Sequence, residues 1–178
     1  EWLGGTRDDA AGEAFDKVAK LLNLGYPGGP VIDEVARGGD PHAIPFPRAF
    51  ISKDSFDFSF SGIKTSVLHY VRKHPHFRVE DIAASFQEAV VDVLVSKAVQ
   101  ASQVLDLPRI VLSGGVASNS RLRTHLQETA KKEGLEVYIP SPILCTDNAA
   151  MIGVIGHYYL ERGRISPLTL DAFSNLPI

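Results

Sequence analysis

The chain has 178 residues, of which 44% are hydrophobic and 22% are charged, which suits one globular domain or two small lobes around a real core. A formal net charge of -3 gives no overall attraction to nucleic acid or acidic lipid, and the sequence has no run of about 20 apolar residues that would span a membrane. The single cysteine, Cys145, rules out an internal disulfide and suits a reducing, cytoplasmic environment.

Hydrophobic residues recur at helical spacing along most of the chain, and glycine or proline marks the ends of these segments. The pattern predicts helices at residues 9–23, 31–37, 63–73, 80–105, 119–132 and 147–162. We expect Asp8 or Asp9 to cap the first helix. In the last helix, Gly153 and Gly156 would permit close packing.

Three short segments have the composition or alternation of strands. They are residues 56–60, where three phenylalanines alternate with polar residues, 109–113 and 136–140. Prolines predict an extended loop over 40–48. The order strand–helix–strand–helix near the C-terminal end predicts a helix-rich α/β fold with at least one parallel crossover.

The stretch IVLSGGVASN, residues 110–119, predicts a turn that could hold a ligand. Gly114 and Gly115 would let the backbone approach a ligand closely, and the helix that follows offers free N–H groups. The stretch fits neither the phosphate-binding loop G-x-x-x-x-G-K-[ST] nor the dinucleotide motif G-x-G-x-x-G. Two interpretations stay open: a nucleotide-holding turn, or a tight connection in which Asn119 only caps a helix.

Acidic residues flank a second glycine-rich turn, YPGGP at 26–30. Asp16 lies on the helix before this turn, where its carboxylate could accept hydrogen bonds from ribose hydroxyls. The alternative is that it pairs with Lys20 at the i,i+4 spacing. Asp33, four residues beyond Gly29, could face the same pocket from the next helix.

The CTDN stretch at 145–148 places Asp147 between a strand and a helix. Asp147 could cap that helix, or it could bind a metal ion if other ligands converge there. None of the six histidines forms an H-x-x-x-H spacing, and one carboxylate alone is not a metal site.

Five stretches, taken together and in this order, resemble the C-terminal half of the bacterial tRNA N6-adenosine threonylcarbamoyltransferase family, TsaD. They are DDAAGEAFDKVAKLLNLGYPGGP, FSFSGIKTSV, SFQEAVVDVL, SGGVASNSRLR and CTDNAAMIG. The resemblance implies an actin-like ATPase architecture with RNase H-like lobes. It divides the chain into a helical insertion at about 1–105 and a strand–helix lobe at about 106–178. Because the chain begins at Glu1 and its one methionine is Met151, we expect that the N-terminal half is absent.

The same resemblance implies an acyltransferase that moves threonylcarbamoyl from threonylcarbamoyl-AMP to N6 of adenosine 37 in tRNAs reading codons that begin with A. It implies that Asp16, Gly29 and Asn119 hold the adenosine part of the donor and that Asp33 adds an acidic contact. Asp147 would be one ligand of a divalent iron or zinc ion. The implied partners are tRNA, ATP or AMP, a TsaB-like paralogue and a TsaE-like ATPase in the cytoplasm, with no membrane.

Two features of the family are missing from these residues: the H-x-x-x-H metal motif and the serine-glycine-glycine-histidine phosphate loop. We therefore expect this piece to be inactive alone and to bind metal weakly. The alternative functions are a non-catalytic TsaB-like partner and another ATPase of the same architecture. The intact SGGVASN and CTDN stretches argue against the first, because an inactive relative would be expected to lose them. The second needs a catalytic aspartate and a phosphate loop upstream, and CTDN has no obvious role in it.

Overall fold

The computed structural model describes residues 1–50 and 55–172. Over these residues it is a helix-rich α/β structure with one two-stranded parallel sheet, as the sequence predicts. In chain order, the elements are α1 (Ala11–Leu21), α2 (Gly28–Ala36), α3 (Ser61–Lys73), α4 (Val79–Val104), β1 (Arg109–Val111), the 3-10 helix η1 (Gly115–Ser118), α5 (Ser120–Lys132), β2 (Glu136–Tyr138), the 3-10 helix η2 (Pro142–Leu144) and α6 (Ala149–Glu161).

All six predicted helices are present, but α2 begins earlier than predicted. Gly28 and Gly29, which we expected in a turn, form its first residues, and Pro30 follows within the first turn. Proline is tolerated there because the first N–H groups of a helix have no partner inside the helix. The glycine-rich run is therefore a helix N-terminus rather than a separate turn.

The predicted capping of α1 by Asp8 or Asp9 is wrong, because its N-cap is Ala10, which makes no side-chain cap bond. Asp8 instead accepts hydrogen bonds at the start of α3, from the backbone N–H groups of Phe60 and Ser61 and from the hydroxyls of Ser59 and Ser61. Burial opposes ionisation of Asp8, but these four hydrogen bonds outweigh it and hold its pKa well below its usual range.

The predicted strand at 56–60 is also wrong, since this segment forms only an isolated parallel bridge between Phe58 and Thr6. The Phe58 N–H donates to Gly5, and its carbonyl accepts from Arg7. The ammonium of Lys97 donates hydrogen bonds to the carbonyl oxygens of Ser55 and Asp57. In a sheet, these carbonyls would accept hydrogen bonds from a neighbouring strand. The alternating phenylalanines thus lie in an extended segment fixed by a buried lysine.

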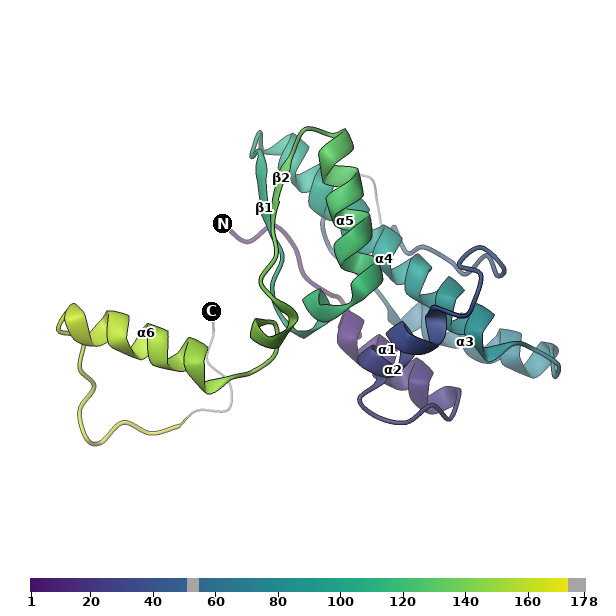
Figure 1. The fold of residues 1–178 in the computed structure, drawn as a ribbon, viewed down its shortest axis with the longest axis horizontal. Coiled ribbons are helices and arrows are strands. Elements are labelled where there is room, and N and C mark those ends of the chain that lie inside the picture. The colour runs from purple at the N-terminus through teal and green to yellow at the C-terminus, as the bar shows by residue number, and fades with distance from the viewer. Residues whose placement is uncertain (51–54, 173–178) are drawn as a thin grey trace.

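Two hydrophobic clusters share the long helix α4 (Figure 1). The N-terminal half of α4 packs with α1, α2 and α3, where Phe15 meets Phe86 edge to face with ring centroids 5.1 Å apart. Its C-terminal half packs with α5 and with the inner residues of the sheet, Ile110 and Val137. The predicted division of the chain near residue 105 stays a prediction.

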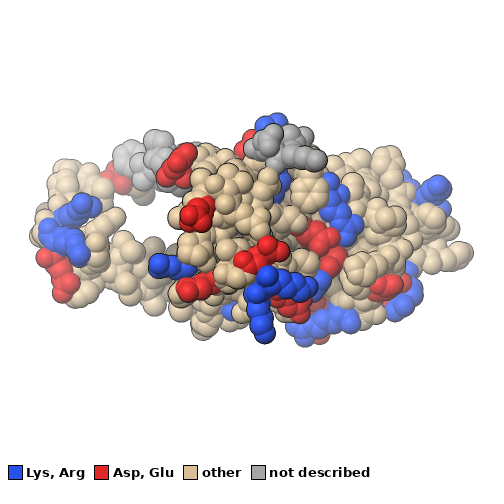
Figure 2. Space-filling view, turned by 90° about the horizontal axis from the view of Figure 1, so that it is seen from above, with Lys and Arg blue, Asp and Glu red and all other residues tan. Residues whose placement is uncertain are grey.

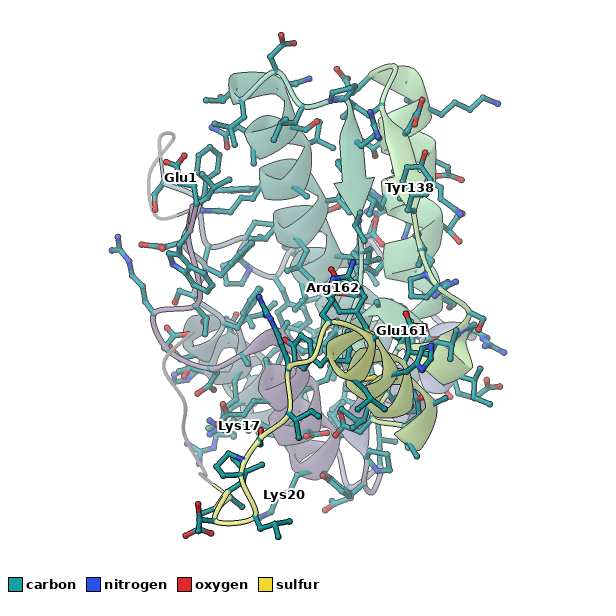
Figure 3. The ribbon with its side chains drawn as sticks, turned by 90° about the vertical axis from the view of Figure 1, so that its left-hand side faces the viewer. Glu1, Lys17, Lys20, Tyr138, Glu161 and Arg162 are labelled. Carbon is teal, nitrogen blue, oxygen red and sulfur yellow. The ribbon has the colours of Figure 1, made fainter. Side chains whose placement is uncertain are left out.

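One face of the sheet and every residue of α6 are exposed in the described part of the chain. Val111 on β1 and Tyr138 on β2 are 72% and 52% exposed. Helix α6 extends away from the helices that form the core (Figure 1), and Figure 3 looks onto this side, with Tyr138 marking β2 and Glu161 the end of α6. The close packing expected at Gly153 and Gly156 is absent here, because a Cβ at either would meet no atom within 4 Å. No helix in the described part of the chain has the length and apolar character needed to cross a bilayer.

Candidate functional site

A cavity of about 540 Å³ lies between α1, α2 and the η1 turn that follows β1. Its lining includes all four residues predicted to hold a nucleotide, which are Asp16, Gly29, Asp33 and Asn119. These residues come from three segments that are up to about a hundred positions apart in the sequence. The fold therefore brings together residues that the family resemblance, rather than their spacing in the sequence, assigned to one ligand.

Asp16 is held at the start of α2. Its Oδ1 accepts a hydrogen bond from the Gly28 N–H at 2.7 Å, so the carboxylate lies where the positive end of the α2 dipole favours it. The alternative ion pair with Lys20 is not formed, whereas Glu13 and Lys17, which have the same i,i+4 spacing on α1, do pair at 2.7 Å. Asp16 thus keeps one carboxylate oxygen for a ligand in the cavity.

Asp33 joins α2 to the N-terminus of α5 across the edge of the cavity. Its two oxygens accept from the hydroxyl of Ser120 at 2.7 Å and from the Ser120 N–H at 3.2 Å. Each carboxylate oxygen has a second lone pair, so Asp33 can accept a further bond from a ligand without releasing Ser120.

Asn119 is the N-cap of α5, as one of the two open interpretations predicts. Its Oδ1 accepts from the Leu122 N–H at 2.9 Å, and its Nδ2 donates to Oε1 of Gln87 on α4 at 2.7 Å. Both side chains are buried. One N–H of the amide remains for a ligand, so capping and ligand binding are compatible at this residue.

The glycines of the site have different roles. Gly114 has φ +87°, a left-handed conformation that only glycine adopts easily, and it directs the chain from β1 into η1. Gly115 and Gly29 line the cavity, and beyond the adjacent backbone a Cβ at either would meet no described atom within 4 Å. The 3-10 turn itself was not predicted, because a four-residue segment carries no periodic signal.

The charges around the cavity favour a ligand rich in hydroxyl groups. Asp16, Asp33 and Glu34 contribute carboxylates, and the one lining cation, Arg37, is paired with Glu34 at 2.8 Å. Such a wall repels a free phosphate and offers several acceptors to hydroxyl groups. The η1 turn contributes Gly115, Val116 and Ser118 to the lining.

Asp147 lies outside the cavity lining, although its neighbour Thr146 belongs to it. The helix cap that we considered for Asp147 is taken instead by Asn148, whose Oδ1 accepts from the Met151 N–H at 3.0 Å. Asp147 is exposed, and over residues 1–50 and 55–172 no other carboxylate, histidine or cysteine gathers with it into a metal-binding group.

A carboxylate–histidine cluster of Glu88, Asp92 and His125, which the sequence analysis missed, is close enough to hold a metal ion. Arg121 already binds Glu88 through two hydrogen bonds of 2.5 and 2.6 Å, and Arg48 binds Asp92 at 2.8 Å. The hydrogen bonds from Arg121 lower the pKa of Glu88, against the effect of burial. Two guanidinium groups thus neutralise the carboxylates that a metal would need, and the cluster joins α4 to α5. Its signal in the sequence was the i,i+4 spacing of the two acids and of Arg121 with His125.

The chain matches one family of known proteins. Residues 1–154 match the family model described as TsaD: tRNA N6-adenosine threonylcarbamoyltransferase. Curated relatives with the same description include proteins of Clostridioides difficile (strain 630), 56% identical over the whole chain, and of Syntrophus aciditrophicus (strain SB), 55% identical over 99% of it. The chain spans only 54% and 53% of the lengths of these relatives.

Two solved structures share the fold. The crystal structure of full-length HypF in the phosphate- and nucleotide-bound form matches 89% of this chain and 26% of its own, with a TM-score of 0.65 and 24% identity. The crystal structure of T. kodakarensis HypF matches 86% of this chain and 20% of its own, with a TM-score of 0.64 and 23% identity. The predicted helix-rich α/β fold class is confirmed, since the chain shares its fold with these two structures.

Proposed function

Because this chain belongs to the tRNA N6-adenosine threonylcarbamoyltransferase family, we propose that it is the part of such an enzyme that binds the adenosine portion of threonylcarbamoyl-AMP. The observation that carries this proposal is the single cavity shared by Asp16, Gly29, Asp33 and Asn119. A volume of about 540 Å³ is within the range of small-molecule sites.

Each residue has a role that its chemistry supports. Asp16 and Asp33 accept hydrogen bonds from the ribose hydroxyls, and the remaining N–H of Asn119 donates to the nucleotide. Gly29 leaves open space for the ligand beside the first turn of α2. The N6 amine of the tRNA adenosine then attacks the carbamoyl carbon, the bond from that carbon to the phosphate oxygen of AMP breaks, and the amine gives up a proton. This chain holds the leaving nucleotide in place during that exchange.

Asp147 is the residue of this chain that we propose as a metal ligand. Its exposed carboxylate caps no helix and follows a residue of the cavity wall, so it fits the role of one oxygen ligand. Its further ligands would come from residues outside these 178. A bound divalent ion, iron or zinc, would polarise the carbamoyl carbonyl.

The proposed substrate is tRNA, and the proposed partners are a TsaB-like paralogue and a TsaE-like ATPase in the cytoplasm. Figure 2 shows one face of the molecule on which basic and acidic side chains are interspersed over a mostly neutral surface. That face carries no basic stripe of the kind that tracks a phosphate backbone.

The first test is calorimetric titration of the purified chain with AMP and with inorganic phosphate. We expect saturable binding of AMP and no binding of phosphate, since the carboxylates select for hydroxyls. Replacing Gly29 with phenylalanine should abolish AMP binding by filling the cavity, whereas Lys131→Ala, an exposed change on α5, should leave it unchanged. Phosphate binding without AMP binding, or unchanged AMP binding in Gly29→Phe, would overturn the proposal.

A further inference from the structure

Arg123, on α5, lies outside the cavity but contacts both the η1 loop, which leads to Asn119, and the loop after β2, which leads to Asp147. Its Nη1 donates to the carbonyl of Ala117 in η1 at 2.9 Å, and its Nη2 donates to the carbonyl of Pro140, just after β2, at 2.8 Å. The η1 loop forms a wall of the cavity, and the loop after β2 leads to Thr146 and Asp147. One guanidinium group thus bridges the two loops.

The chemistry of these contacts suits a fixed link. A planar guanidinium with two donors in a rigid fork holds two carbonyls at a set separation, and hydrogen bonds from a charged donor are stronger than neutral ones. No carboxylate in the described part of the chain pairs with Arg123, so these carbonyls are its main acceptors. The hydroxyl of Ser118 adds a longer link to the carbonyl of Pro142, at 3.4 Å.

The buried thiol of Cys145 lies beside the same link between the two loops. Its side chain is only 4% exposed, its thiol lies 3.6 Å from the carbonyl of Ser141, and its sulfur is 3.8 Å from Nη1 of Arg123. The buried thiol therefore lies beside the Arg123 guanidinium and the carbonyls of Pro140 and Ser141 in the loop after β2. If the link opened, the loop after β2 would lose its tether to α5 and the thiol would become accessible.

We propose that Arg123 is a positioning residue that couples the nucleotide-binding η1 loop to the loop of Asp147. Through this coupling, a nucleotide in the cavity holds the Asp147 loop in place and keeps Cys145 buried. The coupling between the loops is independent of any ligand, and only its response to nucleotide rests on the proposed function.

The test measures the rate at which the only thiol of the native chain reacts with a dithiobis-nitrobenzoate reagent. In Arg123→Ala, we expect Cys145 to react about tenfold faster than in the unchanged chain, since two charge-assisted hydrogen bonds are lost. Arg123→Lys, which keeps a donor but not the fork, should give an intermediate rate. In the unchanged chain, AMP should slow the reaction, and Arg123→Ala should lose that protection together with AMP affinity.

Two control variants separate this role from general destabilisation. Val67→Ala creates a cavity in the other hydrophobic cluster, and Lys131→Ala removes an exposed cation from the same helix as Arg123. Both should leave the Cys145 rate in native buffer unchanged. If Arg123→Ala does not fold, the comparison is made with Arg123→Lys. An Arg123 variant that folds and reacts at the original rate would overturn the coupling. If Cys145 reacts faster in Arg123→Ala but the unchanged chain does not bind AMP, the coupling is supported and the proposed function is refuted.

Discussion

The side-chain amide of Asn119 donates a hydrogen bond to Oε1 of Gln87 at 2.7 Å, and both side chains are buried between α4 and α5. If Asn119 only contacted a ligand, Asn119→Ala would weaken nucleotide binding and hardly change the melting temperature. This buried bond changes that expectation, because the variant would lose the cap of α5 and leave Gln87 without its partner. We expect the free energy of unfolding to fall by about 2 to 4 kcal/mol.

Urea denaturation of Asn119→Ala, Gln87→Ala and the double variant would measure this effect as a double-mutant cycle. Since the two side chains bond to each other, we expect their effects to be non-additive by at least about 0.5 kcal/mol. Asn119→Asp, which keeps the cap but loses the amide donor, should be less destabilised than Asn119→Ala. Strictly additive effects would show that the bond contributes nothing.

The lowered pKa of Glu88 predicts that the free energy of unfolding depends on pH. Hydrogen bonds from Arg121 lower the pKa of its carboxyl in the folded chain, although burial opposes the shift, while an unfolded glutamate has a pKa of about 4.3. The contribution of the pair is therefore complete above that value and is lost as the pH falls towards the folded pKa. We expect the free energy of unfolding to decrease between about pH 5 and pH 3.

Glu88→Gln should flatten this decrease and cost about 2 kcal/mol at pH 7, because a charged hydrogen-bond pair is lost. Equilibrium denaturation at a series of pH values would show both effects. Glu128→Gln, which removes an exposed carboxylate from the helix of Arg121, serves as the control and should leave the pH profile almost unchanged. If the free energy of unfolding of Glu88→Gln falls with pH as steeply as that of the unchanged chain, the pH dependence arises from another group, for example Asp8.

Periodicity predicted the helices and the parallel crossover, because each of these depends on residues that are close in sequence. The contacts that fail prediction join residues far apart. Asp8 precedes α1 by three positions, yet it accepts hydrogen bonds at the start of α3, some fifty residues later. Lys97 is buried on α4 and donates hydrogen bonds to carbonyls in and beside residues 56–60, which a strand would use to pair with its neighbour. The resemblance supplied the site residues that spacing alone left ambiguous, but it did not indicate Gln87 or Arg123, whose roles appear only when α4, α5 and the two loops meet.

Asp8 itself offers a third prediction. Asp8→Ala removes four hydrogen bonds from the start of α3, and loss of such an N-terminal acceptor typically costs about 1 to 2 kcal/mol. Limited trypsin digestion should then cleave faster within α3, after Lys64, Arg72 or Lys73. Glu13→Ala, which breaks only an ion pair on the surface of α1, should be cleaved at the original rate. Equal cleavage of Asp8→Ala and the unchanged chain would mean that α3 does not depend on this cap.

Neighbouring glycines at the start of α2 should respond in opposite ways to the same substitution. A Cβ on Gly28 would lie 2.6 Å from Cα of Asp16 and from the carbonyl oxygen of Phe15, so α1 and α2 would have to move apart. We expect Gly28→Ala to cost about 1 to 3 kcal/mol. A Cβ on Gly29 meets nothing within 4 Å, and alanine is the better helix former, so Gly29→Ala should be neutral or stabilising by up to about 1 kcal/mol.

Thermal denaturation of the two variants, followed by circular dichroism, would compare them directly. AMP titration adds a second readout. Gly28→Ala should weaken binding by displacing Asp16, whose Oδ1 accepts from the Gly28 N–H, whereas one methyl group at Gly29 should reduce affinity only slightly. Equal melting temperatures for the two variants would contradict the close approach of α1 and α2. Weaker binding in Gly29→Ala than in Gly28→Ala would show that the ligand lies against α2 itself and not in the space that Asp16 borders.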